Sequence, residues 1–276
     1  LATLAAQLQG EGPTFLLDAG DITMGSLFHL VAREQAGELR LMNLIGFDGA
    51  ALGNHDFDFR PVGLAEMIRS AQAHGGLPAL LASNLVLDPT DPRDDGLEAL
   101  VAEGLLLDRL LIERQGVTIG LIGLLGRDAT EVMGQADPVT TSDAIEVSTR
   151  LAAELRAAGA DLVVALSHSG VSRMDDGSWG DEDVDLMRGV PGLDVVISGH
   201  SHTLLEEPIL VDGRPVVQAG ANIQHLGELV LERDGERWAV RSYTAHPLDD
   251  SIPGDPAAMA LVQQLKEAVG LELFEG

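Results

Sequence analysis

Cysteine is absent from the 276 residues of this chain, and lysine occurs once, at Lys266. Without cysteine the protein cannot form disulfides or thiolate metal sites, although this absence does not fix the cellular compartment. Aromatic residues make up only 3% of the chain, so the core has to be built from Leu, Val, Ile and Ala. No apolar run reaches the roughly 18 residues of a membrane-spanning helix, and no signal peptide is visible.

Positive charge is also scarce, because 17 basic residues face 44 acidic ones and the formal net charge is −27. Such a surface repels the phosphate backbone of nucleic acid, which argues against duplex nucleic acid as a partner. It also repels a phosphorylated small molecule at long range, and a bound cation could reverse that field locally. Solubility is the simpler explanation of the acidity, so the charge assigns no function by itself.

The length of the chain allows one large α/β domain or two small ones, and 45% hydrophobic residues can form a sizeable core. The sequence starts at Leu1 without a methionine, inside an amphipathic pattern that predicts a helix over 1–8. We therefore expect the natural N-terminus, with any targeting segment, to lie upstream of Leu1.

Predicted strands alternate with predicted helices over the first two thirds of the chain, which favours α/β layering. Apolar stretches predict strands at 14–17, 49–52, 77–81, 161–166 and 193–197, and a hairpin of 106–113 with 117–121. Helices are predicted over 26–45, from Pro61 onward, and over 142–158 with Ser142 as its cap. The acidic segments 88–95 and 172–183 are predicted to be loops, the second of them mobile.

The last third of the chain favours short strands, predicted at 208–211, 215–219, 226–233 and 238–245. They are joined by Asp212-Gly213 and Asp234-Gly235, dipeptides typical of hairpin turns. Residues 256–269 predict an amphipathic helix. We assign residues 1–254 to one domain and 255–276 to a C-terminal helix that could lead into a further domain.

Three short polar runs each follow a predicted buried strand. They are Asp18-Ala19-Gly20-Asp21, Gly53-Asn54-His55-Asp56 and Gly199-His200-Ser201-His202. Strand ends are where α/β folds bind ligands. Together with His168, these runs offer carboxylate, amide oxygen and imidazole without thiolate, a set that suits Mn, Zn, Mg or Fe.

Histidines in this chain fall into two groups. A single His is usually a core or surface residue, but four of the chain's eight lie in glycine-flanked strand ends beside Asp and Asn. That grouping predicts a metal site. The other four, His29, His74, His225 and His246, are predicted to be structural.

Five motifs, in this order along the chain, resemble the catalytic domain of the 5′-nucleotidase family in the calcineurin-like metallophosphoesterase superfamily. They are Asp18–Asp21 followed by Gly25, Gly53–Asp58, Ser83-Asn84, Ser167–Gly170 and Ser198–Thr203, and they span nearly the whole chain. The resemblance implies a four-layer α/β/β/α sandwich of two mixed β-sheets. Residues 226–245 would finish the second sheet, 256–269 would lie outside it, and the motifs would converge at one edge.

The resemblance also implies a role for each residue around two divalent metal ions. Asp21 would bridge both ions. Asn54, His168 and His200 would complete the shell of one ion, and His202 would bind the other. His55 and Asn54 would contact the phosphoryl group of the substrate, and Asp58 would hold and polarise His55. Asp56 replaces the Glu usual in the family, and turn capping or solvation is the alternative role for both Asp56 and Asp58.

Two features of the family have no counterpart in residues 1–276. An Asp-x-His pair on its first strand would precede the Asp18–Asp21 run, so only Asp21 and His202 would serve the second metal here. We therefore expect this chain to bind one metal, bind metal weakly or bind none. The family's C-terminal domain, which holds the nucleobase between aromatic side chains, would follow Gly276.

The function that the resemblance implies is metal-dependent hydrolysis of a phosphomonoester, with a nucleotide as the leading substrate, in the periplasm or at the cell surface. Related hydrolases of cyclic nucleotides, nucleotide sugars or thiosulfate esters are alternatives. A metal-binding module without turnover is an alternative of a different class. The sequence leaves the oligomeric state open.

Overall fold

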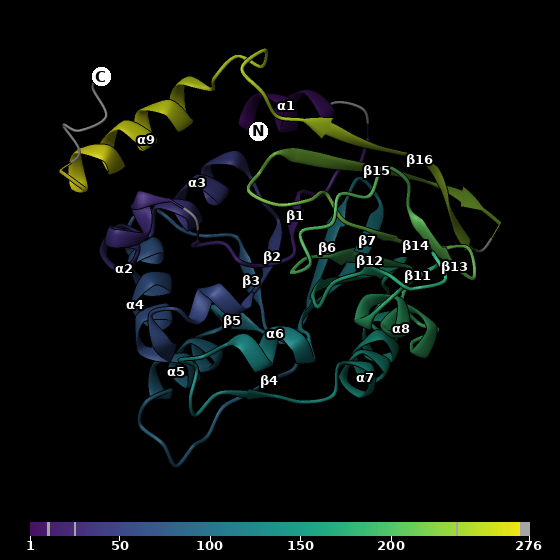
Figure 1. The fold of residues 1–276 in the computed structure, drawn as a ribbon, viewed down its shortest axis with the longest axis horizontal. Helices are drawn as coiled ribbons and strands as arrows, with labels where there is room; N and C mark the ends of the chain where they lie inside the picture. Colours follow the sequence, from purple (N-terminus) through teal and green to yellow (C-terminus); the bar gives the residue numbers. More distant parts are fainter. Residues whose placement is uncertain (10–11, 25, 236, 271–276) are drawn as a thin grey trace.

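A computed structural model describes residues 1–9, 12–24, 26–235 and 237–270 of the chain. Gly25, part of the first motif, lies outside these ranges. Two principal sheets lie at the centre, and helices cover their outer faces (Figure 1). The predicted four-layer sandwich is confirmed, although only one of the two sheets is mixed.

The four-stranded sheet has the order β1 (Leu17–Asp18), β2 (Gly49–Ala51), β3 (Ala79–Leu81) and β5 (Leu106–Leu107). All its pairs are parallel. Helices α3 (Gly37–Ile45), α4 (Arg60–Ala73) and α5 (Asp95–Glu103) connect successive strands. Because a helical crossover returns the chain to the same end of the sheet, this sheet is parallel rather than mixed as expected.

The six-stranded sheet has the order β13 (Ile209–Val211), β14 (Arg214–Val217), β12 (Val195–Ser198), β9 (Leu162–His168), β7 (Val117–Leu125) and β6 (Leu110–Arg114). The edge strands β13 and β6 pair antiparallel, and the inner pairs are parallel. The single strand predicted over 106–113 is therefore wrong: it divides at Asp108-Arg109, and its two halves join different sheets.

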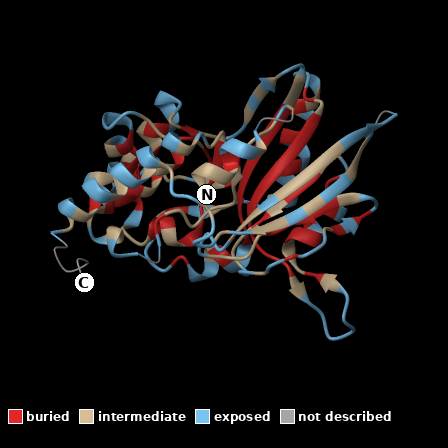
Figure 2. Ribbon diagram, turned by 90° about the horizontal axis from the view of Figure 1, so that it is seen from above, coloured by how far each residue is buried: buried red, intermediate tan, exposed pale blue. Residues whose placement is uncertain are grey.

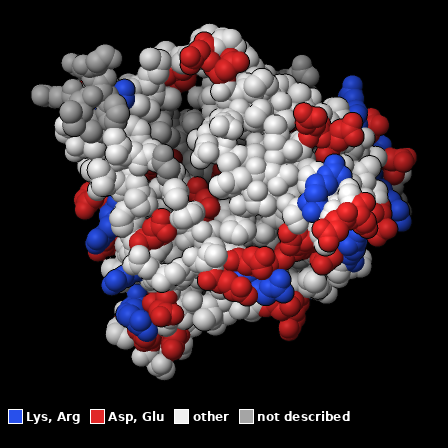
Figure 3. Space-filling model, viewed as in Figure 1, with Lys and Arg blue, Asp and Glu red and all other residues white. Residues whose placement is uncertain are grey.

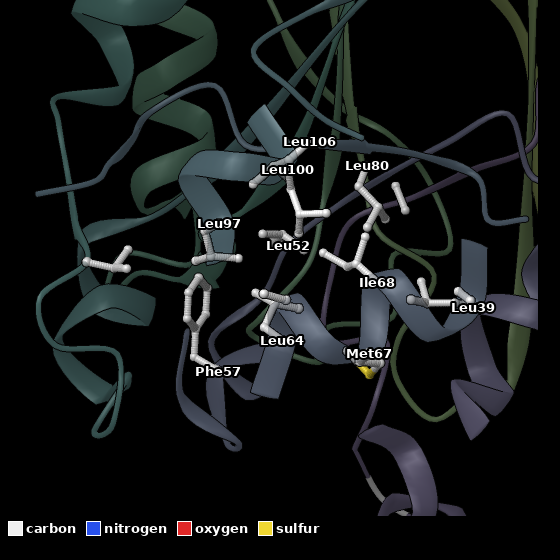
Figure 4. Close-up of a cluster of buried hydrophobic side chains, with 14 of the residues drawn as sticks. Leu39, Leu52, Phe57, Leu64, Met67, Ile68, Leu80, Leu97, Leu100 and Leu106 are labelled. Carbon is white, nitrogen blue, oxygen red and sulfur yellow. The ribbon is translucent and has the colours of Figure 1, made fainter. Parts of the chain in front are cut away.

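Three apolar clusters separate the layers. The first lies between the four-stranded sheet and its helices and includes Leu52, Phe57 and Leu64 (Figure 4). The second packs the six-stranded sheet against α7 (Ala144–Ala157) and α8 (Glu182–Gly189). The third lies between the two sheets, so the inner strands are buried on both faces (Figure 2). This packing holds the strand ends of both sheets in fixed positions.

Residues 1–45 form α1 (Ala2–Leu8), then β1, the 3₁₀ helix η1 (Leu27–Val31), α2 (Ala32–Gln35) and α3. The helix predicted over 26–45 is interrupted at Ala36, whose φ of 45° belongs to the left-handed region. In place of the strand predicted at 14–17, the structure has the shorter strand β1, whose pairing with β2 begins at Leu17. The helix predicted over 1–8 is confirmed.

Strands β15 (His225–Asp234) and β16 (Arg237–Pro247) form a separate antiparallel hairpin, so the prediction that they finish the second sheet is wrong. Leu229, Leu231 and Trp238 pack against the apolar cluster between the sheets. The hairpin covers that cluster because its inner face is apolar.

The C-terminal helix α9 (Pro256–Ala268) packs on α3 and not outside the second sheet as predicted. Leu265 is 1% exposed. It reaches Gly37 so closely that a Cβ there would lie 2.8 Å from its Cδ1. The absence of a side chain at Gly37 therefore lets Leu265 of α9 pack directly against α3.

The acidic segment 172–183 is not a loop throughout. It forms β10 (Ser172–Arg173) and β11 (Trp179–Gly180), and Asp181 caps α8. Asp183 is fully buried in α8. The remaining short elements are η2 (Asn54–Phe57), β4 (Leu85–Val86), α6 (Arg127–Val132) and β8 (Thr140–Thr141). Asp143, rather than Ser142, caps α7.

On the face seen in Figure 3, acidic side chains cover more of the surface than basic ones, and most basic ones lie beside acidic ones. Within the part of the chain that the structure describes, no helix combines the length and apolar character needed to cross a bilayer.

Candidate metal centre

The predicted site residues are carried by strand ends from both sheets. Asp21 follows β1, and Asn54 and His55 open η2 directly after β2. His168 is the last residue of β9, and His200 follows β12. Because these strands run parallel within their sheets and the sheets pack face to face, their carboxyl ends meet at one edge.

Four of these side chains form a tight cluster. The Oδ1 atom of Asn54 lies 3.2 Å from Nε2 of His168 and 3.1 Å from Nδ1 of His200. Nε2 of His168 also lies 3.1 Å from Oδ2 of Asp21. His168 and Asn54 are 2% and 6% exposed, while Asp21 and His200 are partly exposed, so one side of the cluster is buried and the other is open to solvent.

The spacing and chemistry of this cluster fit one divalent cation. Octahedral ligands about 2.1 Å from a metal lie about 3.0 Å from each other, close to the distances between Asp21, Asn54 and His168. Nδ1 of His168 lies 2.7 Å from the carbonyl of Ala19, which fixes the proton on Nδ1 and leaves Nε2 as a lone-pair donor. In the described residues no three His, Cys, Asp or Glu side chains could hold a metal by themselves, so the amide oxygen of Asn54 is needed.

Two glycines allow the loops to approach each other. A Cβ on Gly53 would lie 2.2 Å from Oδ1 of Asp21, and one on Gly199 would lie 2.9 Å from Nδ1 of His168. Either side chain would push a candidate ligand out of the cluster. The packing of the site therefore requires glycine directly before Asn54 and directly before His200.

The backbone is strained at three candidate ligands. Asp21, His200 and His202 have φ values of 61°, 61° and 55°. Such conformations cost about 1–3 kcal/mol for residues with a side chain, and they persist where the surroundings enforce them. Their concentration in two loops of one site indicates a functional constraint.

The charges of the cluster are coupled. Burial alone would raise the pKa of Asp21, but its hydrogen bond and charge interaction with His168 and the bond from the His55 N–H hold that pKa below its usual value. Burial works against the protonated form of His168 too, yet Asp21 raises its pKa. Burial, followed by the charge of His168, lowers the pKa of His200. A neutral imidazole at His200 is the form that binds metal.

His55 lies beside the cluster and pairs with Asp58. Its Nδ1 lies 3.1 Å from Oδ2 of Asp58, while its backbone N–H donates to Oδ1 of Asp21 at 2.8 Å. Nε2 of His55 has no hydrogen-bond partner within the described ranges, and the side chain is 34% exposed. This ring nitrogen is available to an incoming substrate.

Asp56 performs the capping role that the sequence left open. It is 1% exposed and accepts hydrogen bonds from the backbone N–H groups of Gly53 at 2.8 Å and Ile22 at 3.1 Å. Burial, with the nearby charge of Asp21, raises its pKa to about 7. Asp56 thus ties the loop after β1 to the loop after β2.

His202 lies on the same turn as His200 and is exposed. It makes no hydrogen bond through its ring among the described residues. No Arg or Lys forms an ion pair with any of the seven predicted site residues within the described ranges. Since no such cation is paired with the site residues, a bound metal would supply positive charge to a phosphoryl group here.

Two buried polar residues near the site were not predicted as part of it: Gln218, 2% exposed, and Asp183, 0% exposed. Both lie behind the histidine-bearing turns and contact their backbone. Only their position next to apolar strand residues could have drawn attention to them.

Comparison with known proteins agrees with the geometry. Residues 1–204 match the calcineurin-like phosphoesterase family. The chain belongs to this family. Calcineurin-like phosphoesterases use a dinuclear divalent metal site, and the cluster around Asn54 has the ligand types for one of the two positions.

The 5′-nucleotidase of Mus musculus is 29% identical over 288 aligned residues, which cover 96% of this chain and 46% of the mouse protein. The structure of a 5′-nucleotidase precursor from Thermus thermophilus superposes with a TM-score of 0.79 at 26% identity, covering 99% of this chain and 53% of that one. The NAD nucleotidase of Haemophilus influenzae shares the fold, with a TM-score of 0.77 at 18% identity and coverage of 98% and 54%. This calcineurin-like phosphoesterase chain spans about half the length of these relatives.

Proposed function

We propose that the protein is a divalent-metal-dependent phosphoesterase that hydrolyses a phosphomonoester, with a nucleotide as its substrate class. The convergence of Asp21, Asn54, His168 and His200 beside the His55–Asp58 pair carries this proposal. The similarity to 5′-nucleotidases supports the nucleotide. It also supports action outside the cytoplasm, which we propose together with the substrate.

In the proposed mechanism, Asp21, Asn54, His168 and His200 would hold one metal, and Asp21 with His202 would contribute to a second. When bound, such ions polarise the phosphoryl oxygens and activate a nucleophile. Asp58 accepts the hydrogen bond from Nδ1 of His55, which orients the ring and points Nε2 away from Asp58. Nε2 of His55 then stabilises charge on the phosphoryl group or donates a proton to the leaving oxygen.

We also propose that His202 needs further ligands besides Asp21 to hold the second ion, as the resemblance to nucleotidases implies. On this proposal, protein comprising residues 1–276 binds a first equivalent of Mn²⁺ more tightly than any second equivalent. Isothermal titration calorimetry checks this expectation. Two sites filled with equal affinity would contradict it.

Activity is tested by incubating the protein with Mn²⁺ and either p-nitrophenyl phosphate or AMP and measuring released phenolate or phosphate. We expect turnover with Mn²⁺ and its loss with a chelator. A panel of nucleotide sugars, cyclic nucleotides and thiosulfate esters, run in parallel, separates the alternative hydrolases. Metal binding without turnover of any of these would favour the metal-binding module instead.

Removing a ligand is expected to reduce metal binding. Asn54→Ala takes away the oxygen that lies between two imidazoles, and Asp21→Ala takes away the carboxylate paired with His168. We expect either change to weaken Mn²⁺ binding at least about tenfold, measured by elemental analysis after dialysis. Asn43→Ala, at an exposed Asn bonded to the Gly75 carbonyl, is the matched control. Unchanged metal content in Asn54→Ala would contradict the assignment.

A further inference from the structure

The turn that carries His200 and His202 is held from behind by a buried glutamine. We propose that Gln218 is a positioning residue of the metal centre and acts with Ser201 to fix the backbone of this turn. This inference rests on the proposed function, because the turn matters for catalysis only if its histidines bind metal.

Gln218 makes two hydrogen bonds to the turn with the two ends of its amide. Its Nε2 donates to the carbonyl of Gly199 at 2.6 Å, and its Oε1 accepts from the hydroxyl of Ser201 at 2.9 Å. The side chain follows β14, next to β12 in the sheet, and is 2% exposed. Water therefore cannot replace these bonds easily.

The turn itself is unusually tight. The N–H of Ser201 donates to the carbonyl of Gly199 at 2.7 Å, which closes a three-residue turn around His200. A turn of this kind with positive φ at its centre is rare and strained, and His200 has a φ of 61°. The Gly199 carbonyl thus accepts two hydrogen bonds, one from the turn and one from Gln218.

Ser201 extends the network to the neighbouring histidine loop. Its hydroxyl accepts from the N–H of Val171 at 3.1 Å, and the hydroxyl of Thr203 donates to the Val171 carbonyl at 3.1 Å. Val171 lies three residues after His168. The Gln218–Ser201 pair therefore sets the position of the His200 turn relative to the segment that carries His168.

The physical role of Gln218 follows from the backbone strain in the turn that carries His200 and His202. Left-handed φ values at His200 and His202 have to be enforced by surrounding bonds. Loss of the amide would leave the Gly199 carbonyl with only the bond from the Ser201 N–H, which costs free energy. Relaxation of the turn would recover part of that cost and would move the His200 ring away from Asn54.

The test is Gln218→Met, which keeps the length of the side chain and removes both hydrogen bonds. We expect Mn²⁺ affinity, measured by isothermal titration calorimetry well below the melting temperature, to fall about tenfold or more, the range seen when groups that orient metal ligands are removed. The visible absorption spectrum of the Co²⁺-loaded protein should change as well, since it reports ligand geometry.

Tyr243→Phe is the matched control, because the Tyr243 hydroxyl donates to the backbone carbonyl of the same residue, Gln218, at 3.3 Å. We expect it to leave metal affinity and the Co²⁺ spectrum unchanged. Ser201→Ala should resemble Gln218→Met, and the double variant should lose little more than either single one, as expected for residues acting through one network.

Equal Mn²⁺ affinity and an unchanged Co²⁺ spectrum in folded Gln218→Met would overturn the positioning role and leave the proposed function intact. If the unaltered protein binds no Mn²⁺, the proposed function fails. Crystal structures of the metal-free proteins then decide the role of Gln218. The 3.1 Å contact between His200 and Asn54 should be lost in Gln218→Met and kept in Tyr243→Phe, and its survival in Gln218→Met would overturn the inference.

Discussion

Replacing His55 with alanine is expected to lower kcat/KM for AMP at least a hundredfold in the Mn²⁺-loaded protein. Proton transfer by a positioned side chain contributes about 10²–10⁴-fold to rate. His55 is the imidazole whose Nδ1 is held by Asp58 and whose Nε2 is free for substrate. Because its ring makes no hydrogen bond to the Asn54 cluster among the described residues, metal content should stay unchanged.

The leaving group separates two roles for His55. p-Nitrophenolate is a weakly basic leaving group and needs little protonation, so the loss should be smaller for p-nitrophenyl phosphate than for AMP if His55 donates a proton. Equal losses would indicate charge stabilisation alone. Asp58→Asn should give a smaller loss than His55→Ala, and His74→Ala, at the exposed histidine directly after α4, serves as the control. A loss of less than tenfold in His55→Ala would contradict the assigned role.

Asp183→Asn is expected to stabilise the protein at pH 8. Burial raises the pKa of Asp183 to about 7, although the nearby hydroxyls of Ser167 and Ser198 and the bond from the Gly170 N–H favour the charged form. Between its usual value near 4 and about 7 the folded state binds the proton and the unfolded state does not. The stability that wild-type protein owes to this group therefore falls as pH rises through that window.

The asparagine stays neutral at every pH, so the difference in unfolding free energy between the variant and wild type should grow from about pH 4 to about pH 7. Because one pKa unit corresponds to about 1.36 kcal/mol, this difference should reach about 4 kcal/mol at most. Urea titrations of metal-free protein at pH 5 and pH 8 measure it. Asp185→Asn, at an exposed residue of the same helix paired with Arg188, should show a difference below about 1 kcal/mol. A pH-independent difference for Asp183→Asn would contradict the shifted pKa.

The arrangement of the site was largely predictable because its residues are tied to strand ends. Asp21, Asn54, His168 and His200 each follow an apolar run, and parallel strands bring such ends together. Asp58 was placed three residues after His55, and one turn of 3₁₀ helix brings the two side chains to 3.1 Å. The functional roles of these residues remain predictions that the variants above test.

Other predictions were wrong, and some features were missed, because they depend on which surfaces pack against each other in the folded protein. The strand predicted over 106–113 divides between two sheets, the β15–β16 hairpin covers the core between them, and α9 packs on α3. Local sequence patterns carry no information about such partners. The acidic segment 172–183 was predicted to be a mobile loop, yet Asp181 caps α8 and Asp183 is buried.

The sequence by itself determined the family, the layered α/β class and the residues offered to metal, because periodicity and short motifs are local properties of a chain. Only the tertiary structure decided the roles of Gln218, Asp56 and Asp183. Each is polar and becomes significant only through burial against a backbone group far away in the chain, and burial is a property of the packed molecule. The strained turn at His200 likewise exists because the surrounding hydrogen bonds outweigh its local cost.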